Sequence, residues 1–133
     1  YYGEIEVIDN AGVGEITLPV ASSVVQVGYA FTQRLKTLPI NKGSHNGASE
    51  TWIKGFNKIL VKIYDSFIPL INGVRPPSRN PDTPMNEMQP RVTELLEVAE
   101  LGYQKEQRVE IEQDLPRKLT VIYIAGELDQ NTL

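Results

Sequence analysis

The sequence contains no cysteine and a single histidine, His45, and these two scarcities remove several kinds of chemistry. Without cysteine the chain has no disulfide, no thiolate ligand and no thiolate nucleophile. His45 stands in a small polar stretch, where a histidine is usually just exposed to solvent. A zinc site would need three carboxylates beside this one histidine, which is an unusual ligand set. We therefore expect no metal site and no cofactor.

Long apolar runs are also missing. No run exceeds five residues, whereas a helix that spans a bilayer needs about 20. We expect no membrane insertion by this segment. No basic stretch followed by an apolar run is present, so no secretion signal is predicted. The sequence begins with Tyr1 and not with methionine, and we expect a fragment of a larger chain.

What is present predicts one β-rich domain over residues 1–133. The hydrophobic share of 41% and the charged share of 23% are ordinary for a globular chain. Alternation of polar and apolar residues, often with β-branched side chains, predicts strands at several places. The predicted strands are residues 3–10 and 14–20 (as a hairpin), 23–28, 57–64, 108–113 and 119–125, the last of them buried on both faces.

The remaining stretches predict loops. Residues 41–51 are small and polar, which is typical of a mobile loop. Residues 75–90 carry five prolines and predict an irregular proline-rich arm, either a crossover or a segment that docks on a neighbour. Residues 91–100 fit a short helix or a strand. The fold class is therefore mainly β: an antiparallel β-sandwich or barrel-like domain with long loops and at most one short helix.

Charge is distributed unevenly along the chain, although the net charge is only −4. Residues 33–62 hold six basic side chains and one acid, and residues 94–114 hold seven acids and two bases. These regions are either two solvated faces or complementary surfaces that meet a neighbouring copy. The acidic balance and the lack of a basic–aromatic stripe do not indicate a dedicated nucleic-acid binder.

Candidate site residues are acids and one tryptophan. Acids spaced i, i+2 on a strand point to one face, where they either bind a cation or form a solvated surface. The pairs are Glu4/Glu6, Glu110/Glu112 and Glu127/Asp129. Trp52 follows the polar loop and either anchors it to the core or serves as an interface anchor, a role that tryptophan often takes.

Three stretches, taken in order, resemble a known family. Residues 14–39 are similar to a pattern that runs G-x-I-T-L, a short link, V-x-V-G, and a closing L-x-P. Residues 54–66 are similar to K-K-R-I-x-x-V-x-V-R-x-x-x-S, and residues 102–127 to a pattern with R-V-x-I-x-Q-D-x-P and L-T-V. Together they resemble the late, C-terminal part of the tail nozzle (tail tubular protein B-like) structural protein of short-tailed bacteriophages. The chain has Gly126-Glu127 where the family pattern has Pro-Glu.

The resemblance implies a structural virion protein and not an enzyme. It implies a homo-oligomeric ring, typically a hexamer, at the tip of the phage tail, in contact with other tail proteins and assembled in the host cytoplasm. The ring would form the DNA ejection conduit, with no small-molecule substrate and no specific DNA binding. Under this interpretation Glu110, Glu112 and Asp114 are candidate channel or interface acids, because an acidic wall repels the duplex and lets it slide.

Two other classes stay open at this point. The chain could be a carbohydrate- or receptor-binding β-module of a phage or bacterial surface protein, which would need an exposed aromatic platform near Trp52 or Tyr103. A hydrolase would need two carboxylates facing each other across a cleft, roughly 5 to 9 Å apart.

Overall fold

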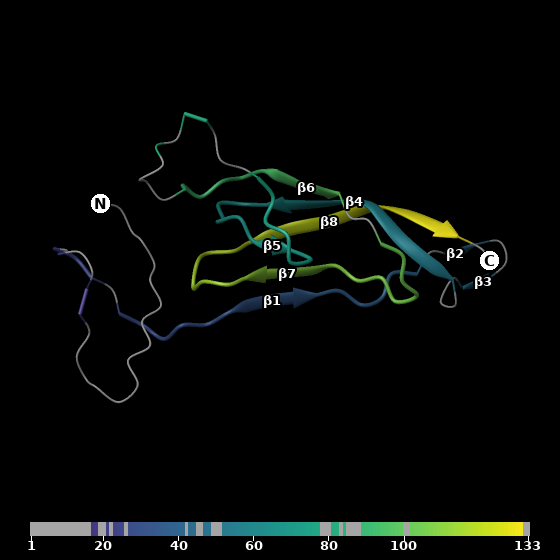
Figure 1. The fold of residues 1–133 in the computed structure, drawn as a ribbon, viewed down its shortest axis with the longest axis horizontal. Helices are drawn as coiled ribbons and strands as arrows, with labels where there is room; N and C mark the ends of the chain where they lie inside the picture. Colours follow the sequence, from purple (N-terminus) through teal and green to yellow (C-terminus); the bar gives the residue numbers. More distant parts are fainter. Residues whose placement is uncertain are drawn as a thin grey trace.

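One long strand organises the described part of the chain. It is β4 (Ile53–Ile63), which lies between β6 (Leu95–Ala99) and β8 (Val121–Asn131) in a three-stranded antiparallel sheet, here called the β4 sheet. Figure 1 shows β8 running beside β4 over most of its length. The strands form where the sequence alternates, because one face of the sheet is buried and the other meets solvent.

The second sheet, here called the β7 sheet, is also antiparallel and has three strands. Its central strand is β7 (Glu110–Gln113), between β1 (Gln33–Lys36) and β5 (Leu70–Ile71). The register places Leu35 and Ile71 on either side of Ile111. Segments that are far apart in the sequence therefore meet in one sheet.

The two sheets pack through their inner faces. Along β4, Ile59, Val61 and Ile63 are fully buried, while the alternate residues are half-buried. Ile71 and Ile111 of the β7 sheet are fully buried in the same core cluster. Each such side chain stabilises the fold by roughly 1.5–3 kcal/mol relative to an exposed position. The predicted fold class is confirmed: the protein is mainly β, with a sandwich-like pair of antiparallel sheets, and no described residue is helical.

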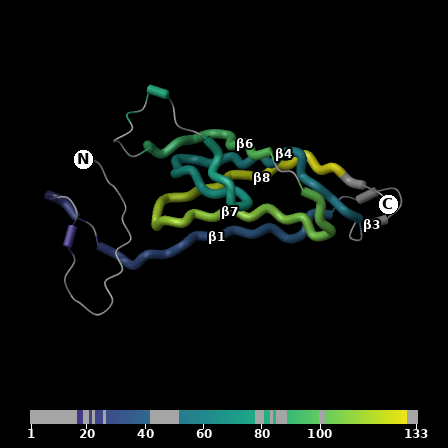
Figure 2. Tube along the Cα trace, viewed as in Figure 1, coloured from purple at the N-terminus to yellow at the C-terminus, as the bar shows by residue number. Residues whose placement is uncertain are grey.

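The computed structural model also contains a small ribbon of β2 (Gly43–Ser44) and β3 (Gly47–Ala48). Figure 2 traces the chain through all the elements. The residues that the structure describes are 17–18, 21, 23–25, 27–41, 43–44, 47–48, 52–77, 81–82, 84, 89–99 and 102–131.

Gly126 of β8 has a clear packing role. A Cβ built on it would lie 2.7 Å from Cε1 of Phe56, a buried core residue on β4. The ring of Phe56 thus occupies the space that any larger residue at position 126 would need. The close approach of the Phe56 ring therefore favours glycine at this position of β8.

One strand prediction was wrong, and another was right about the strand but wrong about its burial. Residues 23–25 and 27–28 form no strand, although their sequence alternates well. Residues 119–125 contribute to β8, but β8 is the edge strand of its sheet, and Ile122 and Tyr123 are about half exposed. Residues 119–125 were expected to be buried on both faces. None of them is fully buried, and the outer edge of β8 has no described neighbour.

The other predictions have mixed outcomes. Residues 57–64 were predicted as the strongest strand, and β4 contains that stretch up to Ile63 but starts four residues earlier. The ambiguous residues 91–100 form the strand β6. The predicted loop at 41–51 contains the β2–β3 ribbon. The described residues of the proline-rich arm form no strand. The predicted hairpin strand at 3–10 and most of its partner at 14–20 lie outside the described residues, as does His45.

Candidate functional site

The candidate acids lie on the outer face of the β7 sheet and at its end. Glu110 and Glu112 alternate with buried residues along β7, so their side chains point away from the core. Asp114 follows directly where β7 ends. The neighbouring edge strand β1 places Arg34 opposite Glu112 and Lys36 opposite Glu110. The structure therefore brings the predicted acids together, but with cations beside them.

Each of the three acids forms an ion pair within the chain. Arg34 Nη2 lies 2.6 Å from Glu112 Oε2, and Arg34 Nε lies 3.1 Å from Glu110 Oε1. Lys36 Nζ lies 3.3 Å from Glu110 Oε2, and Arg75 Nη2 lies 2.8 Å from Asp114 Oδ1. The hydrogen bond to Glu112, and the charges of both glutamates, raise the pKa of Arg34. This face carries balanced charge, and the acids do not form an uncompensated negative surface.

Ion pairs within the chain also join the basic and acidic regions of the sequence. Lys58 of β4 lies opposite Ala99 at the end of β6, and its Nζ is 2.9 Å from Glu97 Oε1. Together with the contacts of Arg34 and Lys36, this joins the basic region of the sequence to the acidic region inside one molecule. The two regions were interpreted as solvated faces or as surfaces for a neighbour. The structure shows ion pairs within the chain on one face of each sheet, and the choice between the two interpretations stays a prediction.

A second charged cluster closes the turn after β4. Asp65 has a positive φ of 41° and its carboxylate accepts hydrogen bonds from Lys118 and from Arg91, the latter at 3.2 Å. The hydrogen bond from Lys118 is the main cause that lowers the pKa of Asp65, and the charge of Arg91 adds to it. The cluster links the end of β4 to the segment before β8 and to the segment before β6. This exposed cluster of Asp65, Arg91 and Lys118, here called the ionic clasp, holds the three connections together.

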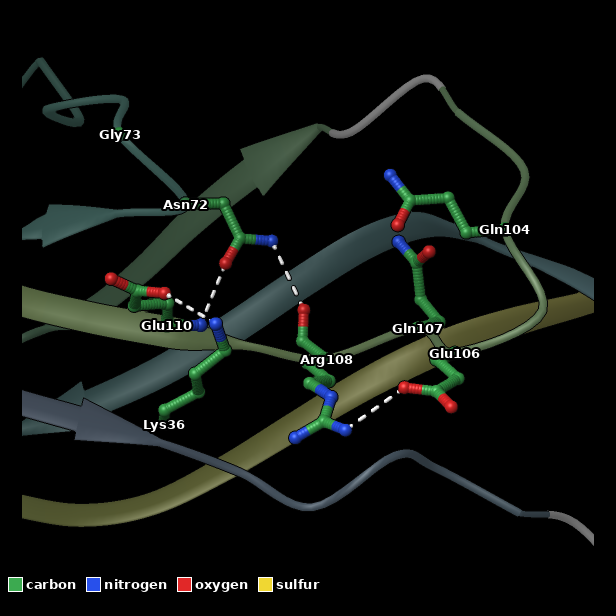
Figure 3. A pocket seen from close by; sticks show the side chains of 8 residues that line it. All are labelled: Lys36, Asn72, Gly73, Gln104, Glu106, Gln107, Arg108 and Glu110. Atoms are coloured by element: carbon green, nitrogen blue, oxygen red, sulfur yellow. Dashed lines mark hydrogen bonds and ion pairs between the residues drawn. The ribbon is translucent and has the colours of Figure 1, made fainter.

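A polar cleft of about 370 Å³ opens where β1, the turn at Asn72 and residues 104–110 meet (Figure 3). Asn72, at φ 46°, holds one wall, since its Oδ1 accepts from the Glu110 amide at 2.7 Å. Arg108 pairs with Glu106 at 2.9 Å on the opposite side in Figure 3. Gln107 is 3% exposed, and its Oε1 has no hydrogen-bond partner among the described residues. No aromatic side chain lines the cleft, whose lining is Lys36, Asn72, Gly73, Gln104, Glu106, Gln107, Arg108 and Glu110.

The two aromatic candidates differ in their surroundings. Trp52 is half-buried directly before β4, next to the β2–β3 ribbon in sequence. Tyr103 is 54% exposed and its ring packs against Gly55, where an added Cβ would lie 3.1 Å from Cδ1. Its hydroxyl donates to Asp129 Oδ2 at 2.9 Å, which raises the pKa of Tyr103. Asp129 of the pair Glu127/Asp129 therefore has a structural partner, and Glu4/Glu6 lie outside the described residues.

Two further features are absent from the described residues. Among them, no group of three or more His, Asp or Glu side chains is arranged to hold a metal ion. Their secondary structure contains no helix of the length and apolarity that a membrane span requires.

No protein-family model matches the chain, and no curated protein matches its sequence. The resemblance to the tail nozzle family is therefore carried by the three stretches quoted above.

Sequence reasoning missed the cleft and the pairing of charges. The cleft has no local signal, because β1, the turn at Asn72 and residues 104–108 come together only in the folded chain. The ion pairs depend on the register of β1 against β7, and no short motif encodes that register. The alternation of acids at 110 and 112 did indicate that they share a face.

Proposed function

We propose that the chain is a non-enzymatic structural domain of the tail nozzle of short-tailed bacteriophages. It would assemble with further copies and with other tail proteins into a ring, and DNA would pass through that ring without being bound. The observation that carries the proposal is the ordered resemblance of residues 14–39, 54–66 and 102–127 to the family pattern. Its location would be the virion tail, after assembly in the host cytoplasm.

The fold supports this proposal through the positions of the resembling stretches. The second and third stretches cover most of β4 and β8 and all of β7, and the first contains β1. In the Gln-Asp-x-Pro part of the third stretch, Gln113 is 1% exposed and Asp114 pairs with Arg75. These residues end β7 and begin the connection to β8. The resembling residues thus lie where they specify strands and the connection between sheets.

The charge of the β7 sheet suggests how a conduit wall would avoid holding DNA. Arginine and lysine bind phosphates without regard to sequence, and each such contact adds affinity. Arg34 and Lys36 are exposed on this face, but Glu110 and Glu112 neutralise them at 2.6–3.3 Å. The hypothesis of a purely acidic wall is thereby replaced by one of a balanced wall, in which the acids keep the cations away from phosphate.

The balanced wall makes a direct prediction for DNA binding. We expect the native chain to bind duplex DNA weakly, and Glu110→Gln with Glu112→Gln to bind it more tightly, because Arg34 and Lys36 are then unpaired. Fluorescence anisotropy with a labelled duplex at several salt concentrations measures this, and the gain should fall as salt rises. The matched control is Glu97→Gln, which releases Lys58 on the other sheet. No gain in the double variant would contradict the balanced wall.

The assembly itself is tested by light scattering over a concentration series, followed by negative-stain electron microscopy of the largest species. The proposal predicts a mass that rises above the 14.9 kDa of one chain and particles with a central opening. A mass of one chain at every concentration would contradict a ring-forming domain.

A carbohydrate- or receptor-binding module is the second candidate, and the polar cleft favours it. Amide and carboxylate side chains are suited to sugar hydroxyls, and Gln107 brings to the cleft wall a buried oxygen that has no hydrogen-bond partner among the described residues. Tyr103 is exposed beside Gln104 in the sequence, but it does not line the cleft. Binding on a glycan array that is lost in Gln104→Ala, with the fold intact, would support this function. An array without any binding would argue against it.

A further inference from the structure

A short apolar segment immediately before β1 has no backbone pairing with any other described residue. Residues 27–32, here called the lead segment, read Val-Gly-Tyr-Ala-Phe-Thr. Val27, Tyr29 and Phe31 are 75%, 97% and 56% exposed, respectively. They alternate with small residues, so a strand of this sequence would present all three on one face. Figures 1 and 2 show the chain before β1 running out beyond the end of the sandwich.

The lead segment does not extend the pairing of β1 with β7, because β7 is too short to reach it. Residues 33–36 of β1 pair with residues 113–110 of β7. Beyond the end of β1, the amides of Thr37 and Ile40 donate to carbonyls on the chain before β7. In the opposite direction β7 ends at Gln113 and the chain turns away. No backbone hydrogen bond joins residues 27–32 to any described residue. Among the described residues their amides and carbonyls have no backbone partner, and pairing with a further strand would satisfy them.

The edge strand β8 offers the same kind of surface. It pairs with β4 on one side, and no described strand pairs with its other side. Its first six residues, 121–126, read Val-Ile-Tyr-Ile-Ala-Gly and carry neither charge nor proline. Ile122 and Tyr123 are 55% and 48% exposed. Proteins commonly protect a sheet edge with lysine, proline or a bulge, and here only the bulge beside residue 122 is present.

We infer that the lead segment of one copy pairs as an added strand with the free edge of β8 in a second copy. Both partners are uncharged over six residues, so joining them buries no ionic group. Both have backbone groups without a partner among the described residues, which the new ladder would satisfy, and both expose apolar side chains for it to cover. This is recognition by strand addition, in which main-chain hydrogen bonds supply affinity and alternate side chains supply specificity.

The pairing joins different surfaces of two copies. Because the lead segment runs away from β8 of its own chain (Figure 2), each copy gives one strand and accepts one. A contact of this kind continues from copy to copy and closes into a ring when its rotation allows. The inference rests on the proposed assembly function and names the surfaces that would carry it.

Cysteine cross-linking tests the pairing directly, because the native chain has no cysteine. One population carries Ala30→Cys in the lead segment and another carries Ala125→Cys on β8. Both alanines are exposed, and each change adds one sulfur atom. The populations are mixed and treated with a short bis-maleimide, and the products are separated on a denaturing gel. Lys105→Cys, in an exposed loop, replaces Ala125→Cys in the matched control.

The inference predicts a cross-linked dimer from the Ala30→Cys and Ala125→Cys mixture. Neither population should give this dimer alone, and the Lys105→Cys mixture should not give it either. The product should be lost when Tyr29→Ser and Phe31→Ser are added to the Ala30→Cys chain, with circular dichroism showing an unchanged fold. Dimer from Ala30→Cys alone would mean that two lead segments pair with each other, and would overturn the inference.

Light scattering on the same samples separates this inference from the proposed function. A mass above one chain with no cross-link between positions 30 and 125 would overturn the strand addition and leave the assembly function standing. A mass of one chain at every concentration, again without cross-link, would overturn both.

Discussion

β4 and the lead segment have the same sequence pattern and opposite surroundings. In β4, Ile59, Val61 and Ile63 alternate and are each 0% exposed. In the lead segment Val27, Tyr29 and Phe31 alternate just as regularly and are all more than half exposed. β4 has a neighbour on both sides and a second sheet over its inner face, whereas the described chain gives residues 27–32 neither. Alternation thus shows which segments are able to form a strand, and the position of a partner decides which of them do.

The largest expected effect comes from making one substitution in both regions. Val61→Ala should lower the free energy of unfolding by about 2–3 kcal/mol, since it removes two buried methyl groups and leaves a cavity. Val27→Ala should change it by no more than about 0.5 kcal/mol in dilute solution. Urea unfolding followed by circular dichroism measures both values. Equal losses would mean that residue 27 packs against the body of the protein.

Glycine substitutions sharpen the comparison further. A Cβ at Gly55 would lie 2.6 Å from the carbonyl oxygen of Gly102, and a backbone atom cannot move aside as a side chain can. We expect Gly55→Ala to cost about 1–2 kcal/mol. Gly28→Ala is the matched control, because nothing lies within 4 Å of its Cβ position, and it should cost nothing measurable. Thermal denaturation of the two variants decides this, and an unaffected Gly55→Ala would contradict the close approach of residues 102–103 to β4.

The ionic clasp at Asp65 should make stability depend on pH in the acid range. Its pKa is lower in the folded chain, chiefly because Lys118 donates to the carboxylate. The stabilisation is therefore complete above the ordinary carboxyl pKa of 3.8 and is lost as the pH falls through the lowered folded value. Asp65→Asn should lose stability at neutral pH and show a smaller further loss on acidification than the native chain. Melting temperatures measured from neutral pH downward test this, with Glu94→Gln, whose carboxylate has no ion pair with a described residue, as control.

The smallest expected effect belongs to the ion pairs on the outer face of the β7 sheet. Arg34 is exposed, and exposed pairs contribute little because water and salt screen them. Arg34→Gln should lower the melting temperature slightly at low salt, and the difference should vanish at high salt. A large loss that persists at high salt would mean that Arg34 also supports packing.

The sequence predicted the fold class and the best strand because both depend on local patterns. Alternation over residues 57–63 and 110–113 identified strands that the structure contains. It also predicted a strand at 23–28, where the structure has none, and could not reveal that residues 119–125 lie at an edge. Those outcomes depend on strand order and on how far β7 extends. These are relations between distant residues, which no window of sequence contains.

In the candidate site, too, local spacing predicts some features and the tertiary structure determines the others. That Glu110 and Glu112 share a face could be predicted from their spacing. Their neutralisation by Arg34 and Lys36 could not, because it depends on a register that joins residues more than 70 positions apart. The buried Gln107 lies beside residues of β1 and of the turn after β5, and only the tertiary structure brings these together. Assignment to the tail nozzle family stays a prediction that rests on three resembling stretches.

Hydrogen–deuterium exchange at two protein concentrations tests most directly whether the lead segment finds its partner in a second copy. Amides of β4 should be protected at both concentrations, since they are paired within one chain. Amides of residues 27–32, and the amides on the free edge of β8 within residues 121–126, should exchange rapidly in dilute solution and become protected together as the concentration rises. Rapid exchange of residues 27–32 at every concentration, or protection that is already complete in dilute solution, would contradict this account.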